Sequence, residues 1–229
     1  MIEKDIIPTD DNKRIEEILK LSWRILKTRF IEKRYEISSE APFQHYFAHI
    51  ISTIGDTYCI TRSEKFMVDL EEKLEVKNNN DEVKKNYIDI TCGFSDGKED
   101  SQGKKTAIEL KFKTKGQSAI DDGRIAAFKD LNKLELASKE DSYAQGRFFM
   151  ITDCQTYIIE SKKGKVGKEF PTHDEAETQA SQTFCYTKKI NKQKKEMKFT
   201  LDNSYHFKWE KIDKKIDKKE DWYFLELKV

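Results

Sequence analysis

Two stretches decide the fold of this chain, YIDITC at Tyr87–Cys92 and TAIELKFK at Thr106–Lys113. Both have the apolar content of strands, yet each carries charge in its middle, where a buried strand would be apolar. Residues two apart in a strand share a face, so Glu109 and Lys111 are expected to point the same way. Asp89 interrupts the earlier stretch in the same manner. Charged residues within otherwise apolar strands concentrate at functional sites.

The connection between the two stretches, Phe94–Lys105, is polar and contains glycine, which predicts that the strands pair in antiparallel fashion. Such pairing would bring Asp89 beside Glu109. Two carboxylates are oxygen ligands that suit a hard divalent cation, and the cation lowers the pKa of a bound water and neutralises phosphate charge. Lys111 could orient that water, hold the phosphate or act as a base. We expect, in outline, hydrolysis of a phosphodiester.

Other elements surround the two stretches in a regular order. Apolar residues at three- and four-residue steps predict helices, alternation predicts half-buried strands, and a continuous apolar run predicts a central strand. The expected elements are a helix over 12–33 capped by Asp10 or Asp11, a helix from Ser38 or Ser39 to Gly55, strands over 66–76, 87–92 and 106–113, a helix over 121–139, a strand over 146–159, and strand-like segments over 197–209 and 222–229.

This order, with one Asp strand followed by a Glu-x-Lys strand, resembles the PD-(D/E)XK nuclease superfamily, the fold of many restriction endonucleases. The resemblance covers residues 40–159 and implies an α/β protein with a restriction-endonuclease-like mixed β-sheet flanked by helices. The first carboxylate of the family maps onto Asp89, the second onto Glu109 and the lysine onto Lys111. The proline in the family's name is replaced by Ile88 here.

The resemblance also implies the surroundings of the site. Mg²⁺ is the implied cofactor, with Mn²⁺ as a substitute, and the backbone carbonyl of Leu110 would complete the metal shell. Glu40, at the start of the second helix, is a candidate fourth ligand, although the helix dipole alone favours an acid there. Double-stranded DNA is the implied partner, and Lys113 and Arg124 are candidate contacts to its backbone.

Basic residues gather near the C-terminus although the formal net charge of the whole chain is only +1. Between Thr187 and Lys198 there are six Lys and one Glu. Lys188 and Lys189 are therefore candidate DNA contacts, with a solvated lysine face as the equal alternative. The aromatic residues beyond this segment favour a small β-rich extension with an apolar core of its own.

The length of 229 residues suits one large domain, with an expected core over 36–160 and a C-terminal β-rich extension over 184–229. The four cysteines lie far apart, which argues against a zinc site or a disulfide framework. The N-terminus is too polar for a signal peptide, and no apolar run approaches membrane-spanning length. We expect a cytoplasmic protein that does not act in a membrane.

Taken together, these features predict a Mg²⁺-dependent DNA endonuclease, and the resemblance favours a homodimeric type II restriction enzyme. Two alternatives stay open, a catalytically silent nuclease-like subunit for DNA binding or assembly and a DNA repair nuclease. Glu109 and Lys111 could also form an ordinary salt bridge at the surface of an edge strand. The sequence names no recognition site, since base-contacting residues follow no fixed spacing.

Overall fold

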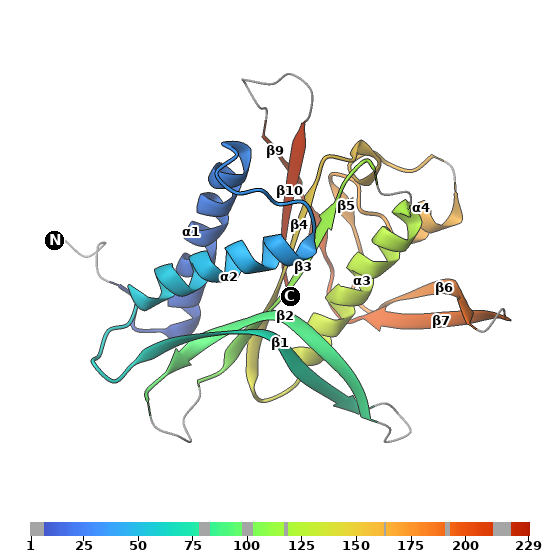
Figure 1. Ribbon diagram of the computed structural model, residues 1–229. Coiled ribbons are helices and arrows are strands. Elements are labelled where there is room, and N and C mark those ends of the chain that lie inside the picture. The colour runs from blue at the N-terminus through green and yellow to red at the C-terminus, as the bar shows by residue number, and fades with distance from the viewer. Residues whose placement is uncertain are drawn as a thin grey trace. The chain divides into compact units, whose positions relative to one another are not determined.

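The computed structural model describes residues 7–77, 83–97, 103–116, 119–162, 164–190, 193–212 and 221–229 (Figure 1). The chain is a mixed α/β protein with strands of very different length. In chain order the elements are α1 (Asp11–Ile31), α2 (Glu40–Asp56), β1 (Lys65–Lys77), β2 (Val83–Ser95), β3 (Lys105–Lys113), α3 (Ile120–Ala137), β4 (Tyr143–Thr152), a 3₁₀ turn η1 (Gln155–Tyr157), α4 (Lys165–Glu169), β5 (Ala176–Glu177), β6 (Gln182–Ile190), β7 (Gln193–Leu201), β8 (His206–Phe207), β9 (Glu210–Ile212) and β10 (Trp222–Lys228).

Six of the strands form one sheet in the order β1-β2-β3-β4-β10-β9, and β5-β8 and β6-β7 form two-stranded sheets. The contacts within the chain divide it into two compact units. The first consists of Met1–Ile108 and Ala137–Gly146, and the second of Glu109–Leu136 and Arg147–Val229. This division differs from the expected core and C-terminal extension, because the C-terminal strands share a unit with most of α3.

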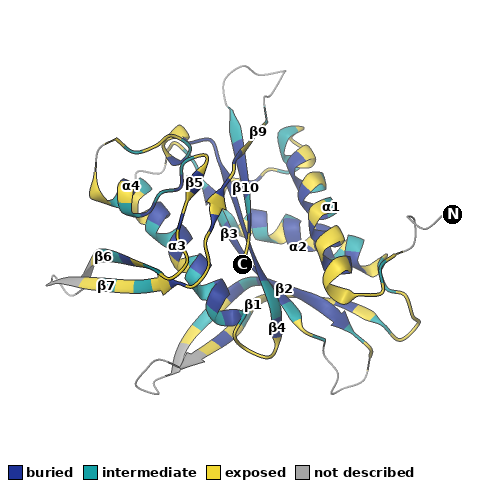
Figure 2. Ribbon diagram, turned by 180° about the vertical axis from the view of Figure 1, so that it is seen from behind, coloured by how far each residue is buried: buried dark blue, intermediate teal, exposed yellow. Residues whose placement is uncertain are grey.

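In the first unit, α1 and α2 pack against each other through aromatic residues. The ring of Trp23 lies 6.0 Å from that of Phe43 and 5.6 Å from that of Phe47. Asp10 caps α1 as predicted, since its carboxylate accepts a 2.9 Å hydrogen bond from the backbone N–H of Lys13. Figure 2 shows that α1 is buried along one side and exposed along the other, as its three- and four-residue apolar spacing predicts.

The expected antiparallel strands are present in the first unit. β1 and β2 pair antiparallel from Lys65 opposite Ser95 to Lys77 opposite Val83, and β2 pairs antiparallel with β3, with Ile90 opposite Ile108. α2 contacts both strands of this hairpin, β1 and β2. The antiparallel order of these three strands is therefore confirmed, and β2 is longer than the segment predicted from the sequence.

Gly55 does not end α2, contrary to the prediction, because the helix continues to Asp56. The glycine has a packing role instead. A Cβ atom at Gly55 would lie 2.0 Å from the ring of Phe66, so only glycine lets the end of α2 approach β1 this closely.

In the second unit, the last strand is part of the main sheet. β10 pairs antiparallel with β4, from Tyr223 opposite Thr152 to Lys228 opposite Arg147. The sequence placed this strand in a C-terminal β-rich extension, whereas in the structure it pairs with β4 of the main sheet. β4 is also shorter than predicted, since η1 follows it after Thr152 and the strand does not reach the expected end.

An aromatic cluster forms the core of the second unit. The ring of Phe128, on α3, lies 5.4 Å from Phe170, 4.9 Å from Phe184 and 5.5 Å from Phe207. α3 is further tied to β7, because the side-chain amide of Asn132 donates to the carbonyl of Thr200 at 3.0 Å. Phe184 and Phe207 thus share one core with Phe128 of α3, whereas the sequence predicted an apolar core of the extension's own.

Candidate active site

Glu109 lies in the middle of β3 with only 1% of its surface exposed. A buried carboxylate is costly unless a cation or hydrogen-bond donors compensate it. The compensation comes from α3, where the Nζ atom of Lys133 lies 2.6 Å from Oε1 of Glu109. The acid is therefore not part of a surface salt bridge, and β3 is an interior strand of its sheet.

Lys111, two residues further along β3, also contacts α3. Its Nζ atom lies 2.6 Å from Oδ2 of Asp130, and it donates a 3.1 Å hydrogen bond to the carbonyl of Leu110. Both side chains of the Glu-x-Lys pair thus contact the same helix, as the prediction of a shared face requires.

These residues form what we call the β3–α3 charge cluster, which consists of Glu109, Lys111, Asp130 and Lys133. Lys133 also lies 3.9 Å from Oδ1 of Asp130, so the aspartate has an ammonium group near each of its oxygens. Two acids and two lysines make the cluster formally neutral. The side chains of Lys111, Asp130 and Lys133 are 12%, 14% and 19% exposed, so all three retain access to water.

Asp89 is half-buried in β2 of the first unit. Its backbone carbonyl accepts a 2.5 Å hydrogen bond from the side-chain amide of Gln44 on α2, and the same amide lies 2.9 Å from Oε1 of Glu71. Glu71 has φ of 52°, a left-handed conformation that few residues other than glycine adopt. Gln44 thereby fixes α2 to the backbone of β2 at the predicted site residue.

Glu40 is the first residue of α2 and is half-buried. It lies one helical turn before Gln44, so the two side chains share a face of α2. The hydrogen bond of Gln44 holds this face of α2 against the backbone of Asp89. Glu40 therefore stays a candidate fourth metal ligand.

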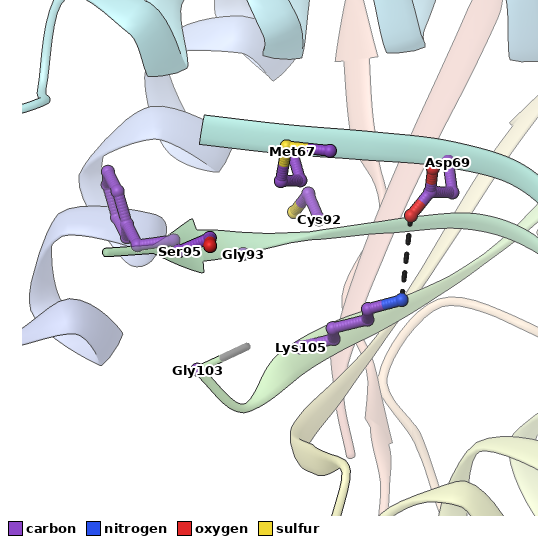
Figure 3. A pocket seen from close by; sticks show the side chains of 8 residues that line it. Met67, Asp69, Cys92, Gly93, Ser95, Gly103 and Lys105 are labelled. Carbon is purple, nitrogen blue, oxygen red and sulfur yellow. Dashed lines mark hydrogen bonds and ion pairs between the residues drawn. The ribbon is translucent and has the colours of Figure 1, made fainter. Parts of the chain in front are cut away.

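Glu72, on β1, is held in a different network around Lys105. Figure 3 shows the ion pair of Lys105 with Asp69 in that network. The Nζ atom of Lys105 lies 2.9 Å from both of its carboxylate oxygens and 3.5 Å from Oδ2 of Asp69, and the Thr91 hydroxyl donates to Glu72. Burial, assisted by the Glu72 carboxylate, raises the pKa of Tyr143 to about 12. The adjacent hollow has a volume of about 10 Å³, roughly the space of one water. This network is therefore structural.

Arg124 does not form part of a DNA-binding surface in this structure. Its side chain is 1% exposed. The guanidinium donates to the carbonyls of Gly167 and Phe170, each at 3.4 Å, and to the carbonyl of Thr156. Burial lowers the pKa of the Arg124 side chain. The arginine holds the segment around α4 together, and we leave it out of the proposed DNA contacts.

The remaining candidate DNA contacts lie at strand ends of the second unit. Lys113 is the last residue of β3 and is half-buried. Lys188 and Lys189 lie in β6 opposite Lys195 and Lys194 of β7, and their side chains are not among those that the structure describes. Their contribution to DNA binding stays a prediction.

A larger hollow of about 140 Å³ lies beside α4 and the β6–β7 hairpin. Its lining includes Glu169, Cys185 and Tyr186, and Glu169 accepts a 2.8 Å hydrogen bond from the backbone of Cys185. None of the predicted site residues lines it. Its mixed acidic, basic and apolar walls select no single class of ligand.

Within the described part of the chain, no group of three or more His, Cys, Asp or Glu side chains is arranged to hold a metal ion. The oxygen atoms that the resemblance assigns to the metal are nevertheless of the right kind, since carboxylates and carbonyls are the ligands of Mg²⁺. Likewise, the described helices include none that is both long and apolar enough to cross a membrane.

The sequence did not identify Gln44, Asp130 or Lys133 as site residues. Gln44 is one turn from Glu40, and that spacing was the available signal. Asp130 and Lys133 are three residues apart on α3, which places them on one face of the helix. Nothing in their spacing says that this face contacts Glu109 and Lys111.

Comparison of the chain with known protein families, with curated proteins and with solved structures finds no match.

Proposed function

We propose that the protein is a Mg²⁺-dependent DNA endonuclease of the type II restriction class. The observation that carries this proposal is the β3–α3 charge cluster, in which Glu109 is buried and Lys111 is held on the same face of the strand. A sheet gains little stability from buried ion pairs compared with apolar packing. A function at Glu109 and Lys111 explains why charge is kept there.

Asp89 joins the proposal through the strand pairing. Ile90 lies opposite Ile108 in the antiparallel pair of β2 and β3. Asp89 immediately precedes the first of these residues in the sequence, and Glu109 immediately follows the second. We therefore propose Asp89 and Glu109 as the two carboxylate ligands of Mg²⁺, with Mn²⁺ as a substitute.

Two further oxygen donors fit the same proposal. The carbonyl of Leu110 follows Glu109 on β3, and Glu40 shares its helix face with the amide that binds the Asp89 carbonyl. When bound, Mg²⁺ supplies a water with a lowered pKa and neutralises charge on the phosphate.

Lys111 is proposed to hold a phosphate oxygen or the attacking water. Its ammonium is fixed by Asp130 at 2.6 Å and keeps partial access to solvent. An ammonium is a compact charge that suits either task. Whether it acts as a base or as an electrostatic anchor decides the pH dependence of cleavage.

Double-stranded DNA is the proposed substrate, and a homodimer would place one site at each strand. Lys113, Lys188 and Lys189 are the proposed contacts to phosphates, which position the duplex without selecting its sequence. A repair nuclease with the same site would differ in substrate and not in chemistry.

A catalytically silent DNA-binding subunit is the second candidate. The observation that favours it is that both members of the Glu-x-Lys pair already have charged partners on α3. Such pairs could be retained for their geometry alone, without a metal or a reaction.

Plasmid cleavage in the presence of Mg²⁺ distinguishes the two candidates. We expect the wild type to cut, and Asp89→Ala and Lys111→Ala each to lose about 1000-fold in rate, the scale of losing one transition-state contact. Lys129→Ala is the matched control, since this lysine is exposed on α3. Equal cleavage by all four proteins would contradict the proposal, and so would the absence of any Mg²⁺-dependent cleavage. Discrete fragments would favour restriction, and a smear would favour a nonspecific nuclease.

A further inference from the structure

Two ammonium groups contact the oxygen atoms of β3 that we propose as metal ligands. Nζ of Lys133 lies 2.6 Å from the Glu109 carboxylate, and Nζ of Lys111 lies 3.1 Å from the carbonyl of Leu110. Each donor atom therefore has a positive partner from the protein itself.

We propose that Lys133 is a resident cation of the metal site, which neutralises Glu109 in the absence of metal and is displaced when a divalent ion binds. This inference rests on the proposed function, because it regulates the occupancy of the same site. Glu109 is 1% exposed, so it needs a cation in every state in which it is ionised.

The chemistry of lysine suits this exchange. An ammonium makes point-like contacts and sits on a flexible four-carbon stem, whereas a guanidinium binds through a rigid fork. The Lys133 side chain is 19% exposed, so it already has a path to water. Displacement requires that its end rotate away from β3.

Asp130 is the positioning residue that receives the displaced ammonium. Its Oδ1 atom lies 3.9 Å from Nζ of Lys133, and its Oδ2 atom lies 2.6 Å from Nζ of Lys111. Lys133 can therefore exchange Glu109 for Asp130 without losing a carboxylate partner. The same aspartate keeps Lys111 in place while the exchange occurs.

The exchange predicts the direction in which metal affinity changes. In the wild type, the divalent ion must displace the ammonium of Lys133 from Glu109. The displaced ammonium stays nearby, and its positive charge repels the bound ion. Removing the charge of Lys133 abolishes both costs, and both changes tighten binding. A lysine that does not lie beside the metal ligands would give no such tightening.

The test is calorimetric titration of the full chain with Mg²⁺ and with Mn²⁺, without DNA. We expect Lys133→Met to bind each ion about tenfold more tightly than the wild type, a change of about one power of ten in Kd. Lys129→Met, an exposed lysine on the same helix, should match the wild type. Unchanged or weaker binding by Lys133→Met overturns the inference.

Two further measurements guard against a variant that folds poorly. Without metal, Lys133→Met should lower Tm by roughly 5 °C, because Glu109 loses its cation. Saturating Mn²⁺ should restore most of that loss. Lys133→Arg keeps the charge, so its Kd should equal or exceed that of the wild type, and tighter binding by this variant would contradict the exchange.

The outcomes separate this inference from the proposed function. If the wild type binds Mn²⁺ and cleaves DNA, Asp89→Ala does neither, and Lys133→Met binds like the wild type, only the resident cation is refuted. If the wild type neither binds the ions nor cleaves, both proposals fall together.

Discussion

The protein buries charge in two different ways, one at Arg14 in the first unit and one in the β3–α3 charge cluster of the second. Arg14 is 2% exposed and contacts Glu64 with two nitrogens, at 2.8 and 2.7 Å. It also lies 2.6 Å from Asp11, donates to the carbonyl of Tyr58 at 2.9 Å, and stacks 3.8 Å over the ring of Phe94.

The β3–α3 charge cluster has no arginine. Its two acids, Glu109 and Asp130, lie 2.6 Å from the ammonium groups of Lys133 and Lys111, respectively. A fork with two bonds to one carboxylate fixes its partner, while an ammonium can leave without breaking a rigid geometry. The comparison therefore separates a structural charge network from one that is suited to exchange.

The largest effect should come from removing the arginine. Arg14→Met removes a buried guanidinium together with its two bonds to Glu64 and its stacking on Phe94, so the free energy of unfolding should fall by about 3 kcal/mol. Urea denaturation measures this change. Arg24→Met, an exposed arginine of the same helix, should change it by less than about 0.5 kcal/mol. If both variants lost a similar free energy of unfolding, Arg14 would not be a special structural contact.

A smaller effect should follow acidification. The hydrogen bond from Arg14 lowers the pKa of Glu64 below its ordinary value of 4.5. The folded form therefore holds its proton less tightly than the unfolded form, so this contribution to stability is complete above the unfolded pKa and is lost as pH falls through the folded one.

Denaturation of the wild type and of Glu64→Gln at pH 7, and at intervals from about pH 5 downward, checks the sign. The stability difference between the two proteins should shrink as pH falls. A difference that stays constant or grows would show that ionisation of Glu64 does not stabilise the fold.

The smallest of these effects on stability should come from Lys111 of the charge cluster. Lys111→Met removes a cation from Asp130, whose side chain is 14% exposed and keeps Lys133 nearby. We expect a loss of about 1 kcal/mol, near the range of partly exposed pairs. A loss as large as that of Arg14→Met would make Lys111 a structural residue. The same variant should nevertheless lose most of its cleavage rate.

Much of the fold could be predicted from local patterns. The cap at Asp10, the helices α1 to α3 and the hairpin strands follow from spacing within a few residues of each other. The pairing of β10 with β4 could not be predicted, because Tyr223 and Thr152 are distant in the sequence and strand periodicity does not name a partner. Gly55 was misassigned for the same reason, since its partner Phe66 belongs to another element.

For the site, the sequence by itself determined that Glu109 and Lys111 share one face of a strand, because side chains alternate with a period of two. It also determined that Asp89 interrupts the neighbouring strand. Only the tertiary structure decided that Glu109 meets Lys133 and that Lys111 meets Asp130. A helix offers several faces, and the one turned toward β3 is selected by packing over the whole unit, which no local spacing encodes.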